Sequence, residues 1–141
     1  MEQLLDGKEI VKSYGEGREK QLVLDHVSLE MERGGFVSVM EPSGSGKSTL
    51  LYTLSGMDSD YSGTVVFDGS TMSGLKEETL ADLRRTKMGF VFQQPAFLKN
   101  LNLLDNIILP VMRENRKNGK AITVKARALM KKVGIEGLEE R

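Results

Sequence analysis

The distribution of apolar and polar residues predicts two strands near the start of the chain, at residues 8–14 and 22–31. The second run alternates between apolar and polar residues from Asp25 to Met31. A polar turn over residues 15–20 separates the two runs. The chain is therefore expected to begin with strands rather than with helices.

Two shorter runs, at residues 36–40 and 88–92, are apolar without alternation. Continuous apolar runs of this length are typical of strands that are buried on both faces of a sheet. The first is followed by a loop rich in Gly and Ser, and the second ends in a Gln-Gln-Pro sequence. Residues 63–69 predict a further strand, closed by an Asp-Gly turn.

Helical patterns occupy four segments, at residues 47–54, 76–87, 103–115 and 123–133. The second has Glu near its start and Arg and Lys near its end, which suits the helix dipole. We expect Gly134 to end the last helix. The chain thus begins with strands, continues with a strand, a loop and a helix, and ends with helices. This order predicts an α/β layout.

The composition is that of an ordinary globular chain. Its 141 residues, 39% hydrophobic and 28% charged, suffice for one domain and not for two. There is no Cys, which excludes disulfides, thiolate catalysis and cysteine-ligated metals and suits a reducing compartment. Since His26 is the single histidine, a histidine metal site is not expected either.

The charge gives no reason to expect nucleic acid as a partner, because twenty Lys and Arg balance twenty Asp and Glu. Residues 111–141 nevertheless hold nine Lys and Arg against four Glu, which indicates a solvated helix face or, alternatively, a polar partner. The acidic start does not resemble a signal peptide, and no apolar run approaches the ~20 residues that span a bilayer. We therefore expect a chain that is not inserted in a membrane.

The strongest chemical signal lies at residues 41–49, Glu-Pro-Ser-Gly-Ser-Gly-Lys-Ser-Thr. They match a phosphate-binding loop at every fixed position but the first, and they stand between a predicted strand and a predicted helix, as that motif requires. Gly44 and Gly46 allow successive N–H groups to converge on phosphate oxygens at the positive end of the helix. The alternative is a Gly/Ser-rich connector that carries this sequence by chance.

Two side chains of the loop, Lys47 and Ser48, have expected roles. Lys47 would bridge the terminal phosphates, and the Ser48 hydroxyl would complete a Mg²⁺ shell made mostly of phosphate oxygens and water. Nucleotide contacts are expected from Ser43, Gly44, Ser45, Gly46, Lys47, Ser48 and Thr49.

Glu41 stands where the phosphate-loop pattern has its first Gly. Two unit charges about 5 Å apart at an effective dielectric near 20 repel by roughly 3 kcal/mol, which corresponds to on the order of a hundredfold in affinity. We therefore expect Glu41 to weaken nucleotide binding. If the carboxylate instead rotates into solvent, the loop would keep its function.

Along its whole length the sequence resembles the nucleotide-binding subunits of ATP-binding-cassette (ABC) transporters. Residues 12–15, Lys-Ser-Tyr-Gly, are similar to the aromatic loop of that family, and residues 90–94, Phe-Val-Phe-Gln-Gln, are similar to its Q-loop. The resemblance implies that Tyr14 stacks on the adenine of ATP and that Gln93 reaches the Mg²⁺ and the terminal phosphate. The implied cofactors are ATP and Mg²⁺, with Ser48 and Gln93 as the metal contacts.

Within the family the sequence is nearest to the bacterial group of lipoprotein-releasing, macrolide-export and bacitracin-type peptide exporters. Residues 101–110 resemble the segment that leads into the family's helical subdomain. Their apolar side chains would pack into a core or against a coupling helix of the membrane subunit. Gly35 stands where the family usually has Glu, and the consequence is local to the turn.

The implied fold class is α/β: half of a P-loop NTPase (RecA-like) core, with an antiparallel β subdomain and the start of a helical subdomain. Residues 1–141 would form a truncated ABC transporter ATP-binding domain, because the family places its signature, its Walker B carboxylates and its switch histidine later than Arg141. The family's central sheet also takes strands from that later part, so we expect an exposed apolar face and an unpaired sheet edge. No residue is assigned a catalytic role.

Two short sequences mimic the missing motifs. Residues 65–68 are an apolar run that ends in Asp, but Gly69 takes the place of the catalytic Glu and a hairpin fits better. Residues 54–57, Leu-Ser-Gly-Met, mimic the signature but stand where a Gly stop of the preceding helix is expected. Both are interpreted as chance matches.

The resemblance implies an ATP-binding subunit that couples Mg-ATP binding to export through a separate membrane permease. It would lie in the cytoplasm, peripheral on the inner face of the plasma membrane, and pair with a second nucleotide-binding subunit. The alternative is a catalytically inactive, truncated chain that at most binds nucleotide or a partner, which Glu41 and the early stop of the sequence favour. Another P-loop enzyme, such as a nucleotide kinase or GTPase, ranks last because no Asn-Lys-x-Asp sequence is present.

Overall fold

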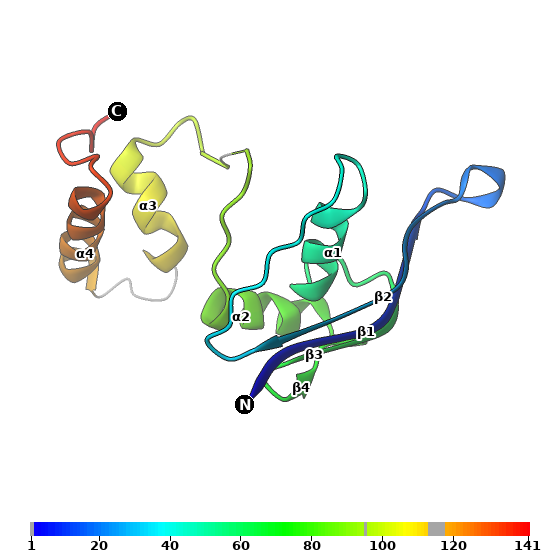
Figure 1. Ribbon diagram of the computed structural model, residues 1–141. Coiled ribbons are helices and arrows are strands. Elements are labelled where there is room, and N and C mark those ends of the chain that lie inside the picture. The colour runs from blue at the N-terminus through cyan, green and yellow to red at the C-terminus, as the bar shows by residue number, and fades with distance from the viewer. Residues whose placement is uncertain (1, 95, 113–117) are drawn as a thin grey trace. The chain divides into compact units, whose positions relative to one another are not determined.

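The computed structural model describes residues 2–94, 96–112 and 118–141. The chain divides into two compact units, Met1–Phe90 and Val91–Arg141, whose helices and strands are labelled in Figure 1. Each unit is internally packed. The single domain expected for residues 1–141 stays a prediction.

The first unit is built on a four-stranded antiparallel sheet with the strand order β2-β1-β3-β4. The strands are β1 (Gln3–Tyr14), β2 (Gln21–Glu32), β3 (Ser62–Phe67) and β4 (Ser70–Thr71), with a 3-10 turn at Gly17–Glu19 between the first two. The two strands predicted at residues 8–14 and 22–31 are confirmed. β1 begins earlier than predicted because its first residues pair on both sides: Leu5 lies opposite Met31 and Phe67.

The predicted Asp-Gly turn joins β3 to β4. Asp68 and Gly69 both have positive φ, 49° and 75°, as a two-residue type I′ hairpin requires. The Asp68 carboxylate forms ion pairs with Arg33 and, at 3.6 Å, with Lys87. The hydrogen bond from Arg33 lowers the pKa of Asp68. The hairpin interpretation of residues 65–68 is confirmed.

Two helices, α1 (Lys47–Leu54) and α2 (Glu77–Lys87), lie on one side of this sheet (Figure 1). Gly56 ends α1 with φ 69° and donates to the Thr53 carbonyl at 3.1 Å, so residues 54–57 are the predicted helix stop. Helices and sheet share one apolar core, made of Ile10, Leu24, Leu50, Leu54, Val65, Phe67, Met72 and Leu80. This core fixes where α1, and hence the loop before it, stands on the sheet.

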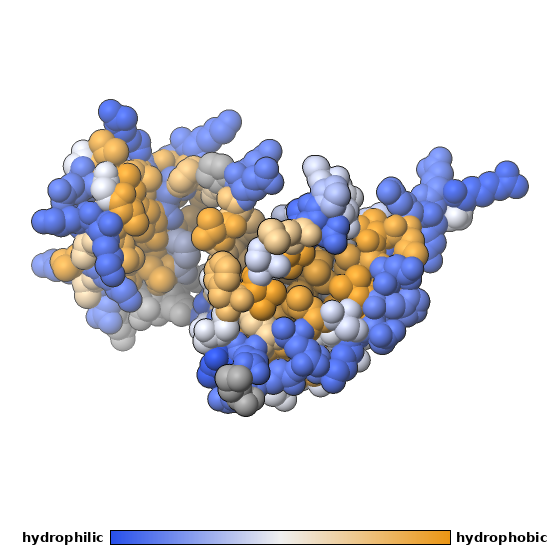
Figure 2. Space-filling model, viewed as in Figure 1, coloured by the Kyte–Doolittle hydropathy of each residue, from blue (hydrophilic) through white to orange (hydrophobic). Residues whose placement is uncertain are grey.

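The strands predicted at residues 36–40 and 88–92 are wrong, since neither run is a strand in the part of the chain that the structure describes. Phe36, Met40 and Val91 are 96%, 84% and 102% exposed. A buried strand needs neighbours on both sides to complete its hydrogen-bond ladder, and the described sheet consists of the four antiparallel strands above. The exposed apolar surface that this leaves on the first unit agrees with the expectation of an open apolar face (Figure 2).

The second unit is a pair of packed helices, α3 (Leu103–Met112) and α4 (Gly119–Lys132). They meet through buried Leu104, Ala126 and Met130, with Leu103, Ile107, Ile108 and Ile135 packed around them. Both predicted helices are confirmed, α4 beginning earlier than predicted. Residues 113–115, predicted as the end of the first, lie outside the described residues.

Gly134 ends α4 as predicted, with φ 77°. Its N–H donates to the Lys131 carbonyl at 3.2 Å, and the N–H of Ile135 donates to that of Met130 at 2.9 Å, which is the pattern of a Schellman motif. Among the described residues, no helix has both the length and the apolar composition needed to cross a membrane.

Candidate functional site

The predicted phosphate loop turns directly into the N-terminus of α1. Gly44 and Gly46 have φ of 84° and 96°, in the left-handed region that favours glycine. A Cβ at Gly46 would lie 2.9 Å from Val23 Cγ1 and 3.1 Å from the Val23 carbonyl oxygen. A side chain is therefore excluded at Gly46 both by backbone angle and by space, and the loop is held against β2.

The N-terminus of α1 offers backbone donors. The first hydrogen bond into the helix runs from the N–H of Leu50 to the carbonyl of Gly46 at 2.8 Å. The N–H groups of Lys47, Ser48 and Thr49 precede it and so have no partner within the helix. A Cβ at Gly44 would meet no atom within 4 Å, so the loop has open space on that side. Donors of this kind at a helix N-terminus bind anions.

The Lys47 ammonium closes the loop on itself. Its Nζ donates to the main-chain carbonyls of Glu41 at 2.6 Å and Pro42 at 2.7 Å. These acceptors are neutral, and a phosphate oxygen forms a stronger, charge-assisted hydrogen bond with an ammonium group. Lys47 is thus held at the start of the loop by acceptors that a phosphate oxygen can replace.

Glu41 fits the loop without backbone strain, because its φ is not positive. Its side chain is exposed, and among the ion pairs of the described residues it forms none with Lys47. The position that the phosphate-loop pattern gives to Gly therefore does not require Gly in this chain. The weakening of nucleotide binding by the carboxylate stays a prediction.

Tyr14, the expected adenine-stacking residue, ends β1 and is 45% exposed. It pairs across the ladder with Gln21, while Gly46 of the loop abuts Val23 of the same strand. A strand rises about 3.3 Å per residue, so the two contact points on β2 are about 7 Å apart along it. The structure thus brings Tyr14 and the phosphate loop to the same part of the β1–β2 pair.

The other expected metal contacts are Ser48 and Gln93. Ser48 is exposed in the first turn of α1. Gln93 is exposed too and belongs to the second unit, so its place beside the phosphate loop stays a prediction. Among the described residues, no group of three or more His, Asp or Glu side chains could hold a metal ion. The exposed Ser48 hydroxyl at the start of α1 is a ligand that fits a Mg²⁺ coordinated mostly by phosphate oxygens and water.

Sequence reasoning missed a charged cluster next to Tyr14. The Lys12 side chain, 4% exposed, contacts Asp58 Oδ1 at 2.9 Å and Asp60 Oδ2 at 3.2 Å. Burial opposes the charge of Lys12, but the hydrogen bonds to Asp58 and Asp60 outweigh it and raise the Lys12 pKa. A signal was present: Lys12 follows Ile10 by two residues, and alternate residues of a strand share a face. Ile10 is fully buried, so a lysine on its face needed a partner.

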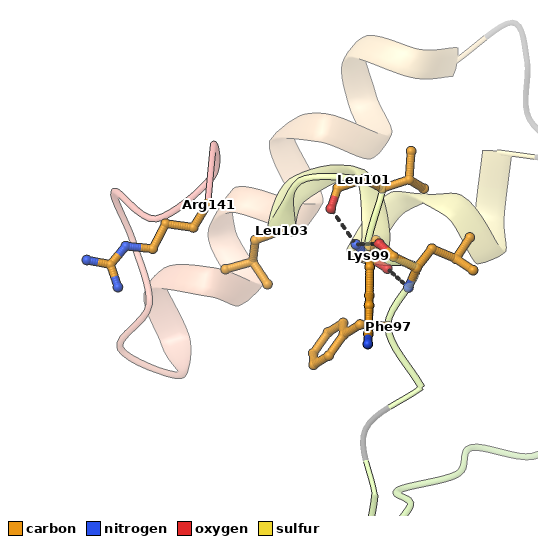
Figure 3. Close-up of a pocket in the computed structure, with 7 residues that line it drawn as sticks. Phe97, Lys99, Leu101, Leu103 and Arg141 are labelled. Carbon is orange, nitrogen blue, oxygen red and sulfur yellow. Dashed lines mark hydrogen bonds between the residues drawn. The ribbon is translucent and has the colours of Figure 1, made fainter.

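A pocket of about 230 Å³ opens in the second unit (Figure 3). Its lining combines apolar side chains with two cations: Phe97, Leu98, Lys99, Leu101, Leu103, Asn106 and Arg141. Asn106 fixes the loop before α3, since its amide donates to the carbonyls of Leu98 and Leu101, both at 3.1 Å. Leu101 and Leu103 belong to the segment expected to pack into a core or against a membrane subunit.

Comparison with known proteins covers most of the chain. The family model described as "ABC transporter" matches residues 24–141. The chain is 44% identical to the bacitracin export ATP-binding protein of Halalkalibacterium halodurans, over 77% of this chain and 43% of that protein. It is 41% identical to the lipoprotein-releasing system ATP-binding protein of Bordetella pertussis, over 96% of this chain and 58% of that protein. The resemblance found in the sequence is confirmed.

The solved structures agree with the sequences. A dimeric ATP-binding cassette in a post-hydrolysis state, bound to ADP and Pi, matches with a TM-score of 0.90 and 33% identity, over 98% of this chain and 61% of that one. The expected fold class, an α/β P-loop NTPase core with an antiparallel β part and helices, is confirmed. The chain spans about half the length of the curated relatives it matches.

Proposed function

Because this chain belongs to the ABC transporter family, we propose that its first unit binds Mg-ATP through the phosphate loop at residues 43–49. One observation carries the proposal: the first three amides of α1 have no partner within the helix, and Lys47, the first residue of that helix, is held by neutral carbonyls of the same loop. Backbone donors, a helix N-terminus and an ammonium group together favour a polyphosphate.

Each residue of the site has a role in this proposal. The phosphates are surrounded by the amides of residues 44–49 and by the hydroxyls of Ser43, Ser45 and Thr49. Lys47 exchanges its carbonyl acceptors for the terminal phosphates. Tyr14 stacks on the adenine. Ser48 would hold the ion within the first unit, and Gln93 of the second unit would be its further ligand, as the family resemblance implies. When bound, Mg²⁺ neutralises phosphate charge and orients the phosphates.

We further propose that the protein is the ATP-binding subunit of an exporter. It would work with a separate membrane permease on the cytoplasmic face of the plasma membrane and pair with a second nucleotide-binding subunit. The names of its relatives, which include bacitracin export and lipoprotein release, support this proposal. The pocket in the second unit, with Leu101 and Leu103 in its lining, is a candidate contact with the permease.

A catalytically inactive nucleotide-binding chain is the second candidate. The carboxylate of Glu41, at the first position of the phosphate-loop pattern, favours this candidate. Steady-state phosphate release above background that disappears in Lys47→Ala would exclude this second candidate.

Titration calorimetry of the chain with Mg-ATP tests nucleotide binding. Lys47→Ala removes a charge-assisted contact to phosphate and should lower the affinity about a hundredfold. The matched control is Lys120→Ala, which removes an exposed lysine of α4 and should leave the affinity unchanged. Equal affinities for the native chain and Lys47→Ala would contradict the proposed site.

A further inference from the structure

Lys12 holds an unusual position for a lysine, because it points into the first unit near the end of β1 and is 4% exposed. Its three ammonium hydrogens have three acceptors: Asp58 Oδ1 at 2.9 Å, Asp60 Oδ2 at 3.2 Å and the main-chain carbonyl of Asp60. A nearly buried ammonium group with every donor used is fixed in one orientation. The Asp58 and Asp60 groups that accept its hydrogen bonds are therefore oriented with it.

Tyr14 is bound to this arrangement by two contacts. The Lys12 Nζ lies over the Tyr14 ring, 4.9 Å from its centroid, which is a cation–π geometry. The Tyr14 hydroxyl donates to Asp58 Oδ2 at 3.3 Å, so the two oxygens of one carboxylate receive Lys12 and Tyr14. We call Lys12, Asp58 and Tyr14 the base-end cluster.

Asp58 is charged in this setting. Burial raises its pKa, but the hydrogen bonds from Lys12 and from the N–H of Asp60, the latter at 3.0 Å, outweigh burial and hold the Asp58 pKa below its usual value. The ion pair is thus intact at neutral pH. A tyrosine has only two side-chain torsions, and the base-end cluster restrains the ring from one face and from its hydroxyl end.

The restrained ring is still open to a ligand. Tyr14 is 45% exposed, and it stands on the part of the β1–β2 pair that also contacts the phosphate loop. A ring that is already oriented loses less conformational entropy when a flat base stacks on it. Orientation of Tyr14 before binding therefore strengthens binding of the base and has no effect on the phosphates.

We propose that Lys12, together with Asp58, is a positioning residue that orients the Tyr14 ring to receive the adenine of ATP. This inference rests on the proposed function, in which Tyr14 stacks on adenine. It adds a specific consequence: Lys12 contributes to affinity for the base and contributes nothing to affinity for the triphosphate. A lysine that merely supports the fold would affect both ligands alike.

The experiment compares two ligands by titration calorimetry: Mg-ATP, and inorganic triphosphate with Mg²⁺, which lacks the base. Tyr14→Ala should weaken Mg-ATP binding about tenfold, the usual size of a base–aromatic stack. Lys12→Met keeps the length of the side chain and loses its charge, and should weaken Mg-ATP binding about threefold. Neither variant should change the affinity for triphosphate.

A double variant separates positioning from support of the fold. In the Tyr14→Ala background, Lys12→Met should have no further effect on Mg-ATP affinity, because there is no ring left to orient. Tyr14→Phe offers a second route if Lys12→Met fails to fold. It keeps the ring, loses the hydrogen bond to Asp58, and should weaken Mg-ATP binding about twofold with triphosphate binding unchanged.

The failures are distinguishable. If the native chain binds neither ligand, the proposed function is refuted and this inference with it. If Mg-ATP binds and Tyr14→Ala weakens it, but Lys12→Met and Tyr14→Phe do not, this inference alone is refuted. Equal losses for Mg-ATP and triphosphate in Lys12→Met, or a further loss in the double variant, would show support of the fold and overturn the positioning role.

Discussion

The two ends of the proposed nucleotide site are built in different ways. The phosphate end is made from backbone: two glycines in the left-handed region and the open amides of α1. The base end is made from side chains, with Lys12, Asp58 and Tyr14 joined by charge and hydrogen bonds. The phosphate end therefore depends on the absence of a Cβ at particular places, whereas the base end depends on the charge state of its groups.

The largest effect is expected at Gly46. Gly46→Ala places a Cβ 2.9 Å from Val23 Cγ1 in a left-handed conformation and should lower the free energy of unfolding by about 3 kcal/mol, with loss of Mg-ATP binding. Gly44→Ala is the matched control, since it has the same kind of φ but open space around its Cβ, and should cost about 1 kcal/mol. Urea unfolding measures both values.

Similar losses in the two glycine variants would mean that φ alone matters at this loop. The contact between Gly46 and β2 would then have no part in holding the phosphate end, and the difference drawn between the two ends would be weaker.

A smaller effect is expected from Glu41, which adds a charge to the phosphate end. Its exposed carboxylate repels the phosphates through solvent, and the effect lies between the values for water and for a partly buried pair. Glu41→Gly should therefore strengthen Mg-ATP binding about tenfold. Glu41→Gln keeps the size of the side chain and should give most of the same gain. If calorimetry finds all three affinities equal, the carboxylate is harmless where it lies.

The smallest effect concerns pH at the base end. Because the pKa of Asp58 is lower in the folded chain than its usual 3.8, its ion pair stabilises the fold above that pH and is lost as the pH falls through the folded value. Asp58→Asn should lower the midpoint of thermal unfolding by about 4 °C at pH 7, and this difference should shrink below about pH 4.

Asp60→Asn is the control for the pH experiment, because the Asp60 side chain is 95% exposed and its main-chain carbonyl still receives Lys12. It should change the midpoint little at any pH. A difference between the native chain and Asp58→Asn that stays constant down to pH 2 would contradict the charge-based account of the base end.

The sequence predicted the local elements of this fold well. Strands β1 and β2, the Asp68–Gly69 turn, and the helix stops at Gly56 and Gly134 all depend on neighbours along the chain or on glycine's freedom at positive φ. The runs at residues 36–40 and 88–92 were predicted wrongly because an apolar run indicates burial but does not supply the neighbouring strands that burial requires.

In the candidate site, too, the part that depends on local sequence was predictable and the part that depends on distant residues was not. The loop at residues 43–49 could be found from sequence, since a backbone cradle needs glycines at fixed spacing. The base-end cluster could be found only in part, because Lys12 meets Asp58 across 46 residues of chain. Composition and spacing do not reveal which carboxylate neutralises a buried lysine, whereas the packing of α1 on the sheet does.

The central claim is that the backbone of the phosphate loop receives the nucleotide. Amide NMR spectra of the ¹⁵N-labelled chain, recorded while Mg-ATP is added, test it most directly. We predict that the resonances of Gly44 to Thr49 shift most and that their hydrogen exchange slows. Resonances of the loop that stay in place while others move, or a spectrum that does not change at all, would contradict the account.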